Sequence, residues 1–416
     1  IRACAKAYKK KLIERGSNLL PHVIISATEH HSIIECVKDL LSVGDLDVTQ
    51  IQPTIYGNIL PDDVEKEIKP NTCLISIMYA NNEIPVINNI REIGAIAHKN
   101  RIPMHSDCVQ VFGKYNIDLL AHNIDALSAS AHKFYGPKGM GLLIISNTLI
   151  DGYGLTAEIS GTQQRGLRGG TENIAGIASM MTALKYAFVS RKKKNVKLYA
   201  LRCRLLEKLA KCYTFNEFIN YVEGVDGVDG NMSSSNSSSN SSSNSSSNSS
   251  SNSSSNSSSN SSSNDGLNDG LNDGSLDQDT KTDGNRSKRS KSNKNQQPKP
   301  VEKKDLEILS LGPPEDKKAF ILPNTVLLAI CKNRGKPFCN VELKKFLDGK
   351  NFVVSIGAAC MTSSDKASHV VSAIGSPPVV KRGILRISFG DNNTVSEVDR
   401  FVSILKQGID KQCADL

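Results

Sequence analysis

The chain has 416 residues, of which 38% are hydrophobic and 22% are charged, and its formal net charge is +9. These values are typical of a globular protein with one large or two moderate domains. No apolar run approaches the length of a membrane-spanning helix, so we expect no membrane insertion. Much of the positive charge lies in local runs such as 191–197, so the net charge alone does not predict a nucleic-acid partner.

The ten cysteines show neither a CxxC pair nor regular spacing, which is not the pattern of a disulfide framework. We therefore expect a reducing compartment, either the cytoplasm or an organelle. The chain begins with Ile1 on a basic amphipathic segment rather than with a charged stub and an apolar core. This start argues against a secretory signal peptide and leads us to expect a fragment that lacks the beginning of the protein.

Short apolar runs alternate with helix-like segments over the first part of the chain. The apolar runs predict buried strands at 22–27, 72–80, about 101–107, 126–131 and 141–146. Amphipathic patterns at 30–44 and 87–100 predict helices between them. This alternation predicts an α/β fold with a doubly wound, mostly parallel sheet, whose ligands should lie beyond the carboxyl ends of the strands.

A low-complexity segment interrupts the chain from about 222 to 318. It contains an SSSN tract, an NDGL repeat and Lys- and Gln-rich sequence, which lack the apolar residues needed to offset the entropy of ordering. We therefore expect a disordered insertion at 222–318. The segments around it are expected to form a large domain at 1–185 and a smaller C-terminal α+β domain from 186–221 and 319–416.

Polar residues follow the ends of four of the predicted strands, and they are His30, Asn82, Asp107, Gln110, Ser130, His132 and Lys133. Taken singly, such a residue is more often a helix cap or a turn former. Because the carboxyl ends of parallel strands meet at one edge of a sheet, we expect these side chains to surround one crevice.

Lys133 has the most specific chemistry in this set. A partly desolvated lysine can lose its proton and react with an aldehyde cofactor. A lone lysine is usually a surface residue, but here an acid, a histidine ring and hydroxyl groups are expected nearby. An acid can hold a pyridinium nitrogen protonated and the other groups can bind a phosphate, so the set predicts pyridoxal 5′-phosphate (PLP) as the cofactor.

Eight motifs occur in the order and spacing of one family: TEHHSI, NNEIP, HSDCVQVFGK, SAHKFYGPKGMG, RGLRGGTEN, LPNT, SIGAAC and LRISFG. On these motifs the chain resembles the cysteine desulfurases, class-V aminotransferase-like enzymes that use PLP and have the type I fold of PLP-dependent transferases. The resemblance covers nearly the whole chain outside the insertion, and HKFYGPKG is its most specific element. Selenocysteine lyases look similar over the same motifs.

The resemblance implies a role for each matching residue around the cofactor ring. Lys133 would bind the cofactor covalently, and Asp107 would pair with the pyridine nitrogen. Gln110 would bond the phenolic oxygen, and His30 would stack on the ring as a catalytic residue.

The same resemblance implies the contacts to the phosphate and to the substrate. Ser130 and His132 would hold the phosphate, joined by Thr171 from the second subunit of a homodimer. Asn82 would contact cofactor or substrate, and Arg386 would bind the carboxylate of the amino acid, which suits the rigid fork of a guanidinium. No metal site is predicted.

Cys360 lies in GAACMTSS, after an apolar run at 351–357 and before a helix expected near Ser368. Residue type alone favours a buried cysteine, whereas the small and polar neighbours favour an exposed loop. The resemblance implies that Cys360 is the nucleophile, which would attack the substrate sulfur as a thiolate. The spacing to the next motif resembles the long-loop branch of the family, in which a mobile loop delivers sulfur to acceptor proteins.

Three features depart from the family pattern. Pro85 stands where a glycine is usual, and Gln164 where a glutamate is usual. The phosphate-binding Gly-Ala-Thr-Glu-Ser loop of the family precedes the position that matches Ile1. We therefore expect weak cofactor binding if Ile1 is the true start, and normal binding if the chain is a fragment.

The resemblance implies a cysteine desulfurase, which converts L-cysteine to L-alanine and transfers the sulfur to an enzyme cysteine. Expected partners are a second copy and a sulfur-acceptor or iron–sulfur scaffold protein, with neither membrane nor nucleic acid. Two alternatives remain: a selenocysteine lyase, which the sequence does not separate from a desulfurase, and a non-catalytic interaction protein that retains the fold. Visible absorbance separates the last from the enzymes, because lysine-bound PLP is yellow whereas a protein without the cofactor is colourless.

Overall fold

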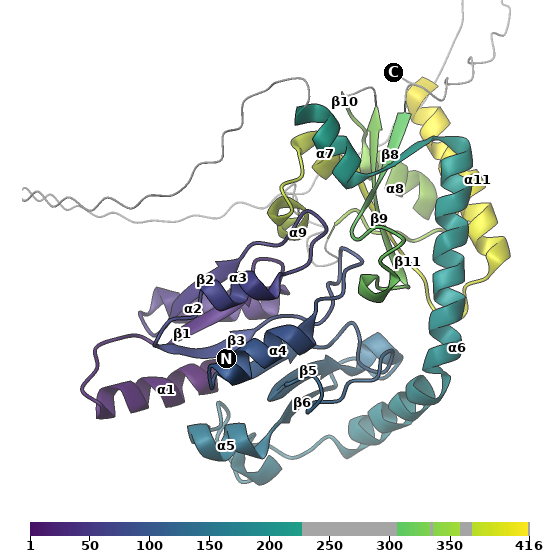
Figure 1. Ribbon diagram of the computed structural model, residues 1–416. Helices are drawn as coiled ribbons and strands as arrows, with labels where there is room; N and C mark the ends of the chain where they lie inside the picture. The colour runs from purple at the N-terminus through teal and green to yellow at the C-terminus, as the bar shows by residue number, and fades with distance from the viewer. Residues whose placement is uncertain (227–305, 333–335, 358–367, 415–416) are drawn as a thin grey trace, which may run out of the picture. The chain divides into compact units, whose positions relative to one another are not determined.

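Among the residues that the computed structural model describes, six strands form the larger of two β-sheets (Figure 1). In chain order they are β1 (His22–Ser26), β2 (Asp47–Ile51), β3 (Thr72–Ser76), β4 (Met104–Asp107), β5 (Ala126–Ser130) and β6 (Gly141–Ile145). They lie in the order β2-β1-β3-β4-β5-β6, and the first five are parallel. Every residue of β1 and β3 is buried, as expected for parallel strands covered on both faces. The predicted doubly wound, mostly parallel sheet is confirmed.

Two strands of this sheet differ from the predictions. The sequence predicts β6 as a buried parallel strand, but it pairs antiparallel with β5, and its Leu143 is 58% exposed. The connection between β5 and β6 is too short for the crossover that a parallel pair needs. β2 is absent from the prediction because its sequence DVTQI mixes polar with apolar residues and is mostly only partly buried.

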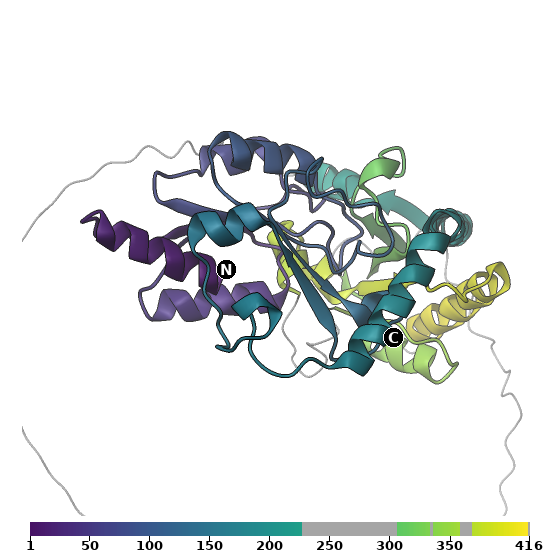
Figure 2. The same cartoon turned by 90° about the horizontal axis from the view of Figure 1, so that it is seen from below.

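Helices cover both faces of the larger sheet (Figures 1 and 2). They are α1 (Arg2–Glu14), α2 (His31–Ser42), α3 (Pro61–Lys66), α4 (Ile90–Lys99) and α5 (Asn147–Tyr153). Val23 and Ile25 of β1 share a core cluster with α1, α2 and α5, whereas Ile24 shares another with α3 and α4. This division follows from the two-residue repeat of a strand, which points successive side chains to opposite faces.

A single long helix, α6 (Ile174–Cys212), connects the larger sheet with the smaller one. Ala187 in its first half joins the core under the larger sheet, whereas Leu201 in its second half joins the core of the smaller sheet. The predicted domain division after residue 185 therefore lies inside a continuous helix. The two cores separate between Ala187 and Leu201.

The smaller sheet is mixed. Its strands are β7 (Thr214–Glu217), β8 (Leu306–Leu311), β9 (Thr325–Lys332), β10 (Lys336–Pro337) and β11 (Ile384–Ser388). β8 pairs in parallel with β7 and antiparallel with β9, and β10 and β11 also pair antiparallel with β9. The helices of this part are α7 (Phe218–Asp226), α8 (Asn340–Asp348), α9 (His369–Ala373), α10 (Pro378–Arg382) and α11 (Val395–Ala414).

The structure describes residues 1–226, 306–332, 336–357 and 368–414. The predicted insertion at 222–318 is wrong at both ends, because α7 continues to Asp226 and β8 begins at Leu306. The smaller domain therefore resumes at Leu306 rather than at residue 319. The prediction missed β8 because the Lys-rich sequence before it made the whole region look like low-complexity sequence. The rest of the predicted insertion lies outside the described residues.

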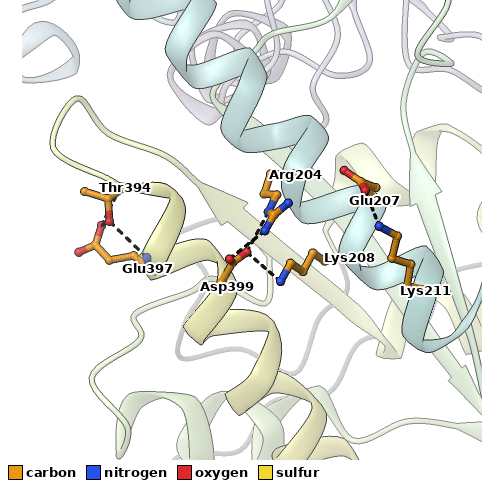
Figure 3. Close-up of polar contacts among 7 residues, drawn as sticks. All are labelled: Arg204, Glu207, Lys208, Lys211, Thr394, Glu397 and Asp399. Carbon is orange, nitrogen blue, oxygen red and sulfur yellow. Dashed lines mark hydrogen bonds and ion pairs between the residues drawn. The ribbon is translucent and has the colours of Figure 1, made fainter.

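Ion pairs join α6 to α11 in the smaller domain (Figure 3). Arg204 binds both carboxylate oxygens of Asp399, at 2.9 and 3.0 Å, and Lys208 Nζ lies 3.2 Å from the same carboxylate. The paired charges therefore connect the second half of α6 to the C-terminal helix. Within the described ranges, no helix combines the length and the apolar character needed to cross a bilayer.

Candidate active site

The carboxyl ends of neighbouring strands of the larger sheet border a pocket of about 590 Å³. Side chains from α6 and β11 complete its lining. The predicted site residues that line it are His30, Asn82, Asp107, Gln110, Ser130, His132, Lys133 and Arg386. The structure therefore brings together all predicted site residues except Thr171 and Cys360. Their roles toward a cofactor stay predictions.

His30 caps the N-terminus of α2, at the end of the turn that connects β1 with this helix. Its Nδ1 accepts a hydrogen bond from the backbone N–H of Ser32 at 3.2 Å and lies 2.9 Å from the Ser32 hydroxyl. Because Nδ1 is an acceptor, the neutral ring carries its proton on Nε2. Burial lowers the pKa of His30, which favours this neutral form.

Asp107 ends β4 and is 8% exposed. Its Oδ1 accepts a hydrogen bond from the backbone N–H of Val109 at 2.9 Å. Burial raises the pKa of Asp107, whereas that hydrogen bond and the nearby His30 and Lys133 act in the opposite direction. A cation against this carboxyl group would favour its ionised form, because opposite charges stabilise each other most in a desolvated site.

Lys133 lies on the short 3-10 helix η1 (Ala131–Phe134), which follows β5. Its side chain is accessible from the pocket. Loss of surrounding water and the charge of Arg386 lower the pKa of Lys133, although Asp107 partly opposes them. A lysine with a lowered pKa has more of its amine in the neutral, nucleophilic form.

Ser130 and His132 form a polar pair beside Lys133. The Ser130 hydroxyl lies 2.8 Å from His132 Nδ1, and both residues line the pocket. A hydroxyl and an imidazole can both donate to an anion. The pair therefore offers a place for an anionic group next to the amine.

Arg386 enters the pocket from β11 of the smaller sheet. Its guanidinium donates a hydrogen bond to the backbone carbonyl of Asn82 at 3.0 Å. Its backbone N–H donates to the carbonyl of Ser355 at 2.7 Å, and its own carbonyl accepts from the Ser355 N–H at 3.1 Å. These contacts fix both ends of the arginine, and they leave a rigid cation at the pocket that suits a carboxylate ligand.

Two predicted site residues are not placed in the pocket. Thr171 is exposed in a loop before α6 and does not line the pocket of its own chain, so its action in a second subunit stays a prediction. Cys360 lies outside the described residues, in 358–367. Residues on either side of that range lie near pocket residues: Ser355 pairs with Arg386, and His369 Nε2 lies 3.0 Å from the carbonyl of Glu29, next to His30.

Glu29 is a buried acid that the sequence analysis missed. It is 0% exposed, and its Oε1 accepts hydrogen bonds from the backbone N–H of Met78 at 2.7 Å and from the Ser26 hydroxyl at 2.8 Å. Burial raises the pKa of Glu29 to about 8, so the carboxyl group is mostly protonated at neutral pH. Its position shortly after the buried strand β1 was the available signal.

Lys114 is a second missed residue, and it lines the pocket with Lys133. Burial and the charge of Lys133 lower the pKa of Lys114 to about 8, against the opposing effect of Asp391. It is the last residue of the motif HSDCVQVFGK. Because lysine side chains are usually exposed, the residue type alone did not predict that Lys114 would be buried.

The chemistry of these groups fits PLP. The pocket holds an accessible amine of lowered pKa, a buried acid for the ring nitrogen, and a hydroxyl–imidazole pair for the phosphate. Among the described side chains, no group of three or more His, Cys, Asp or Glu residues could hold a metal ion.

Comparison with known proteins identifies the family of this chain. Residues 1–220 match the family model described as Aminotransferase class-V. The chain belongs to the class-V aminotransferase family. The predicted resemblance is confirmed, because relatives in this class-V family are named cysteine desulfurases.

Two of these relatives are named cysteine desulfurase IscS. The protein from Methanosarcina thermophila is 29% identical over 395 residues, which is 94% of this chain and 70% of the relative. The protein from Clostridium botulinum strain Hall is 40% identical over 211 residues. That match spans 50% of this chain and 49% of the relative, or about half the length of each.

Solved structures share the class-V fold. A NifS-like protein superimposes with a TM-score of 0.62 at 22% identity, over 98% of this chain and 80% of that one. A structure titled "SspA in complex with cysteine" gives a TM-score of 0.56 at 23% identity, over 94% and 81% of the two chains. At these identities the likeness shows the fold.

Proposed function

We propose that this chain is a PLP-dependent cysteine desulfurase, which converts L-cysteine to L-alanine and passes the sulfur atom to an enzyme cysteine. The observation that carries the proposal is the pocket in which Lys133, Asp107 and Arg386 lie together. The class-V family and the relatives named cysteine desulfurase support the same activity. The non-catalytic alternative is disfavoured, because it gives no reason to keep these three charged groups around one pocket.

Several residues would hold the cofactor. Bound PLP would supply an electron sink for the bond that breaks at the substrate Cα. Lys133 would hold the cofactor covalently and move the Cα proton. Its lowered pKa leaves more of its amine unprotonated, and therefore available as a base, near neutral pH. Asp107 would keep the ring nitrogen protonated. The remaining contacts would come from His30, Gln110, Ser130 and His132.

Arg386 would bind the carboxylate of the amino acid, with Asn82 beside it. The thiolate of Cys360 would then attack the sulfur of the substrate. An S–S bond forms while the C–S bond breaks, and the electron pair of the C–S bond passes to the carbon that becomes the methyl group of alanine after protonation. The enzyme is left with a persulfide, and only a thiolate is nucleophilic enough for this attack.

Partners and location belong to the same proposal. We expect a homodimer in which Thr171 reaches the phosphate of the second subunit, and a sulfur-acceptor or iron–sulfur scaffold protein. We also expect a reducing compartment, since the ten cysteines show neither a CxxC pair nor the regular spacing of a disulfide framework. A relative from Saccharomyces cerevisiae, named "Cysteine desulfurase, mitochondrial", is 39% identical over 177 residues, which is 40% of this chain and 34% of the relative.

The test compares two cysteine variants of the PLP-loaded full chain. Cys360→Ser should keep the visible absorbance of bound PLP but form neither alanine nor sulfide from L-cysteine, because a hydroxyl is a far poorer nucleophile toward sulfur. Cys339→Ser, at an exposed cysteine, is the matched control and should behave as the unmodified chain. Undiminished alanine from Cys360→Ser would contradict the proposal. A protein that stays colourless with PLP would instead support the non-catalytic alternative.

The same assay separates the two enzyme classes. Alanine formation from L-cysteine and from L-selenocysteine is measured side by side on the unmodified chain. A desulfurase turns over cysteine and depends on Cys360. Turnover of selenocysteine alone would identify a selenocysteine lyase.

A further inference from the structure

The middle of α6 carries unusual residues on the face that points away from the core. Ala187 and Leu198 on its inner side are 7% and 5% exposed. On the outer side, Tyr186, Val189 and Val196 are 73%, 89% and 73% exposed. The helix is therefore buried along one side and presents three large apolar side chains on the other.

These residues lie along one stripe of the helix. Tyr186, Val189, Lys193 and Val196 follow one another at intervals of three, four and three residues, which places them on one face. Single exposed apolar residues are common on protein surfaces. Exposed valines, however, make no packing contacts and have a lower helix propensity than most residues. Two of them in line with a tyrosine therefore indicate a surface that packs against an apolar partner.

The same face is positively charged. Lys185 and Lys192 flank the stripe and Lys193 lies within it, and all three are exposed. None of the three forms an ion pair with an acidic side chain of the part of the chain that the structure describes. In α6 the first acidic residue is Glu207. The neighbouring Lys194, by contrast, turns inward and pairs with Asp391.

We propose that this outer face of α6, formed by Lys185, Tyr186, Val189, Lys192, Lys193 and Val196, binds an acidic amphipathic segment of another protein. Apolar side chains of that segment would cover the tyrosine and the valines, and its carboxylates would lie against the three lysines. Recognition of this kind uses apolar anchors at helical spacing for affinity and opposite charges for orientation and rate. The inference does not depend on the proposed enzymatic activity.

Other occupants fit this face less well. A second copy related by two-fold symmetry would bring lysines against lysines, which is repulsive. A nucleic acid would satisfy the lysines but would leave Val189 and Val196 without apolar contacts. A membrane surface favours a broad apolar face of large side chains, whereas here Lys193 interrupts the stripe between the two valines.

The test uses a fluorescently labelled helical peptide in which leucines and glutamates repeat at intervals of three and four residues. Binding to the PLP-loaded full chain is followed by fluorescence anisotropy at low salt. Two control peptides are included, one with every glutamate replaced by lysine and one with every leucine replaced by serine. We expect binding of the acidic leucine peptide only, weakening as salt is added.

Two double variants of the face are compared with a matched control. Lys192→Glu with Lys193→Glu, and Val189→Ser with Val196→Ser, should each weaken peptide binding roughly tenfold. Lys6→Glu with Lys10→Glu makes the same charge change on exposed positions of α1 and should leave binding unchanged. Circular dichroism and alanine formation should be the same for all variants, because none of these residues lines the pocket.

Three outcomes would overturn the inference. In the first, both variants of the face bind the peptide as tightly as the control variant does. In the second, a DNA duplex or vesicles of anionic lipid bind more tightly than the peptide and respond to the same substitutions. In the third, sedimentation shows that the substitutions on α6 change the oligomeric state, which would make the face a contact between copies.

Discussion

The larger sheet buries polar side chains near its carboxyl ends, whereas the smaller sheet is built on an apolar strand. In β4 the residues His105, Ser106 and Asp107 are all buried, and the two nitrogens of His105 lie 2.8 Å from Ser76 Oγ and 2.9 Å from Ser128 Oγ. In β9, every residue but the last is buried, and most are aliphatic.

This difference separates chemistry from stability. Buried polar groups are tolerated where each finds a partner, and such groups can be tuned for reaction. An apolar strand paired on both sides stabilises the fold but offers no reactive group. Substitutions in the larger sheet should therefore change activity first, and substitutions in the smaller sheet should change the free energy of unfolding first.

Lys133→Ala should give the largest effect. Loss of the amine removes both the covalent hold on PLP and the group that moves the Cα proton, so alanine formation should fall on the order of 10³-fold or more. The unfolding midpoint of the cofactor-free protein should hardly move, because the side chain is accessible rather than packed. Lys138→Ala, in the exposed turn that follows, is the control and should retain activity. Equal activity of the two variants would remove Lys133 from the chemistry.

Leu328→Ala tests the opposite side of the comparison. Leu328 is 0% exposed in the centre of β9, between Ser310 of β8 and Leu385 of β11. Creating a cavity there should lower the free energy of unfolding by about 2–5 kcal/mol. Val353→Ala, at a residue that is 88% exposed in the same domain, should change it little. Denaturant titration measures both, and a large loss of turnover per folded molecule in Leu328→Ala would break the proposed division.

The sequence predicted the larger sheet better than the smaller one for physical reasons. Runs such as VII in β1 are apolar without interruption because parallel strands are buried on both faces, and the polar residues after them stand out. The orientation of β6 was mispredicted because it depends on the length of the connection from β5 rather than on composition. β8 was missed because it stands next to low-complexity sequence that dominates any local average.

The candidate site shows the same limit. The positions of His30, Asp107 and Lys133 around one pocket follow from the parallel arrangement of the strands, whose carboxyl ends share one edge of the sheet, and the alternating pattern predicts that arrangement. The protonation of Glu29 does not, because it depends on how completely distant segments bury that carboxyl group. The chemistry of the residues predicted PLP, whereas the individual role of each residue came from the family motifs. The role of Cys360 as nucleophile stays a prediction because Cys360 lies outside the described residues.

Glu29→Gln should give a smaller, pH-dependent effect. The pKa of Glu29 is about 8 in the folded chain against an ordinary value of 4.5, so between these values the folded state keeps a proton that the unfolded state releases. The unmodified chain should therefore lose stability as pH rises from about 5 to 8, by at most about 1.4 kcal/mol per pH unit from this group. The glutamine variant, which cannot ionise, should lack this loss.

Denaturant titrations at several pH values measure the Glu29 effect as the difference between the two proteins. Glu35→Gln is the control, because Glu35 is exposed on α2 and pairs only with Lys38 on the same helix. Its difference from the unmodified chain should be nearly constant with pH over this range. A constant difference for Glu29→Gln as well would show that Glu29 is ionised at neutral pH in the folded chain.

Asp399→Asn should give the smallest effect. The hydrogen bonds from Arg204 hold the pKa of Asp399 down to about 2, so its contribution is present above about pH 4 and is lost as pH falls through 2. At neutral pH the variant should have a slightly lower thermal midpoint, and the difference should shrink in high salt because the pair is partly exposed.

Glu207→Gln is the matched control in Figure 3, since Glu207 pairs with Lys211 within α6 and joins no second helix. Its effect should be smaller still, because a pair within one helix adds nothing to the docking of α6 on α11. Equal effects of the two variants at every salt concentration would mean that the Arg204–Asp399 pair does not help to hold these helices together.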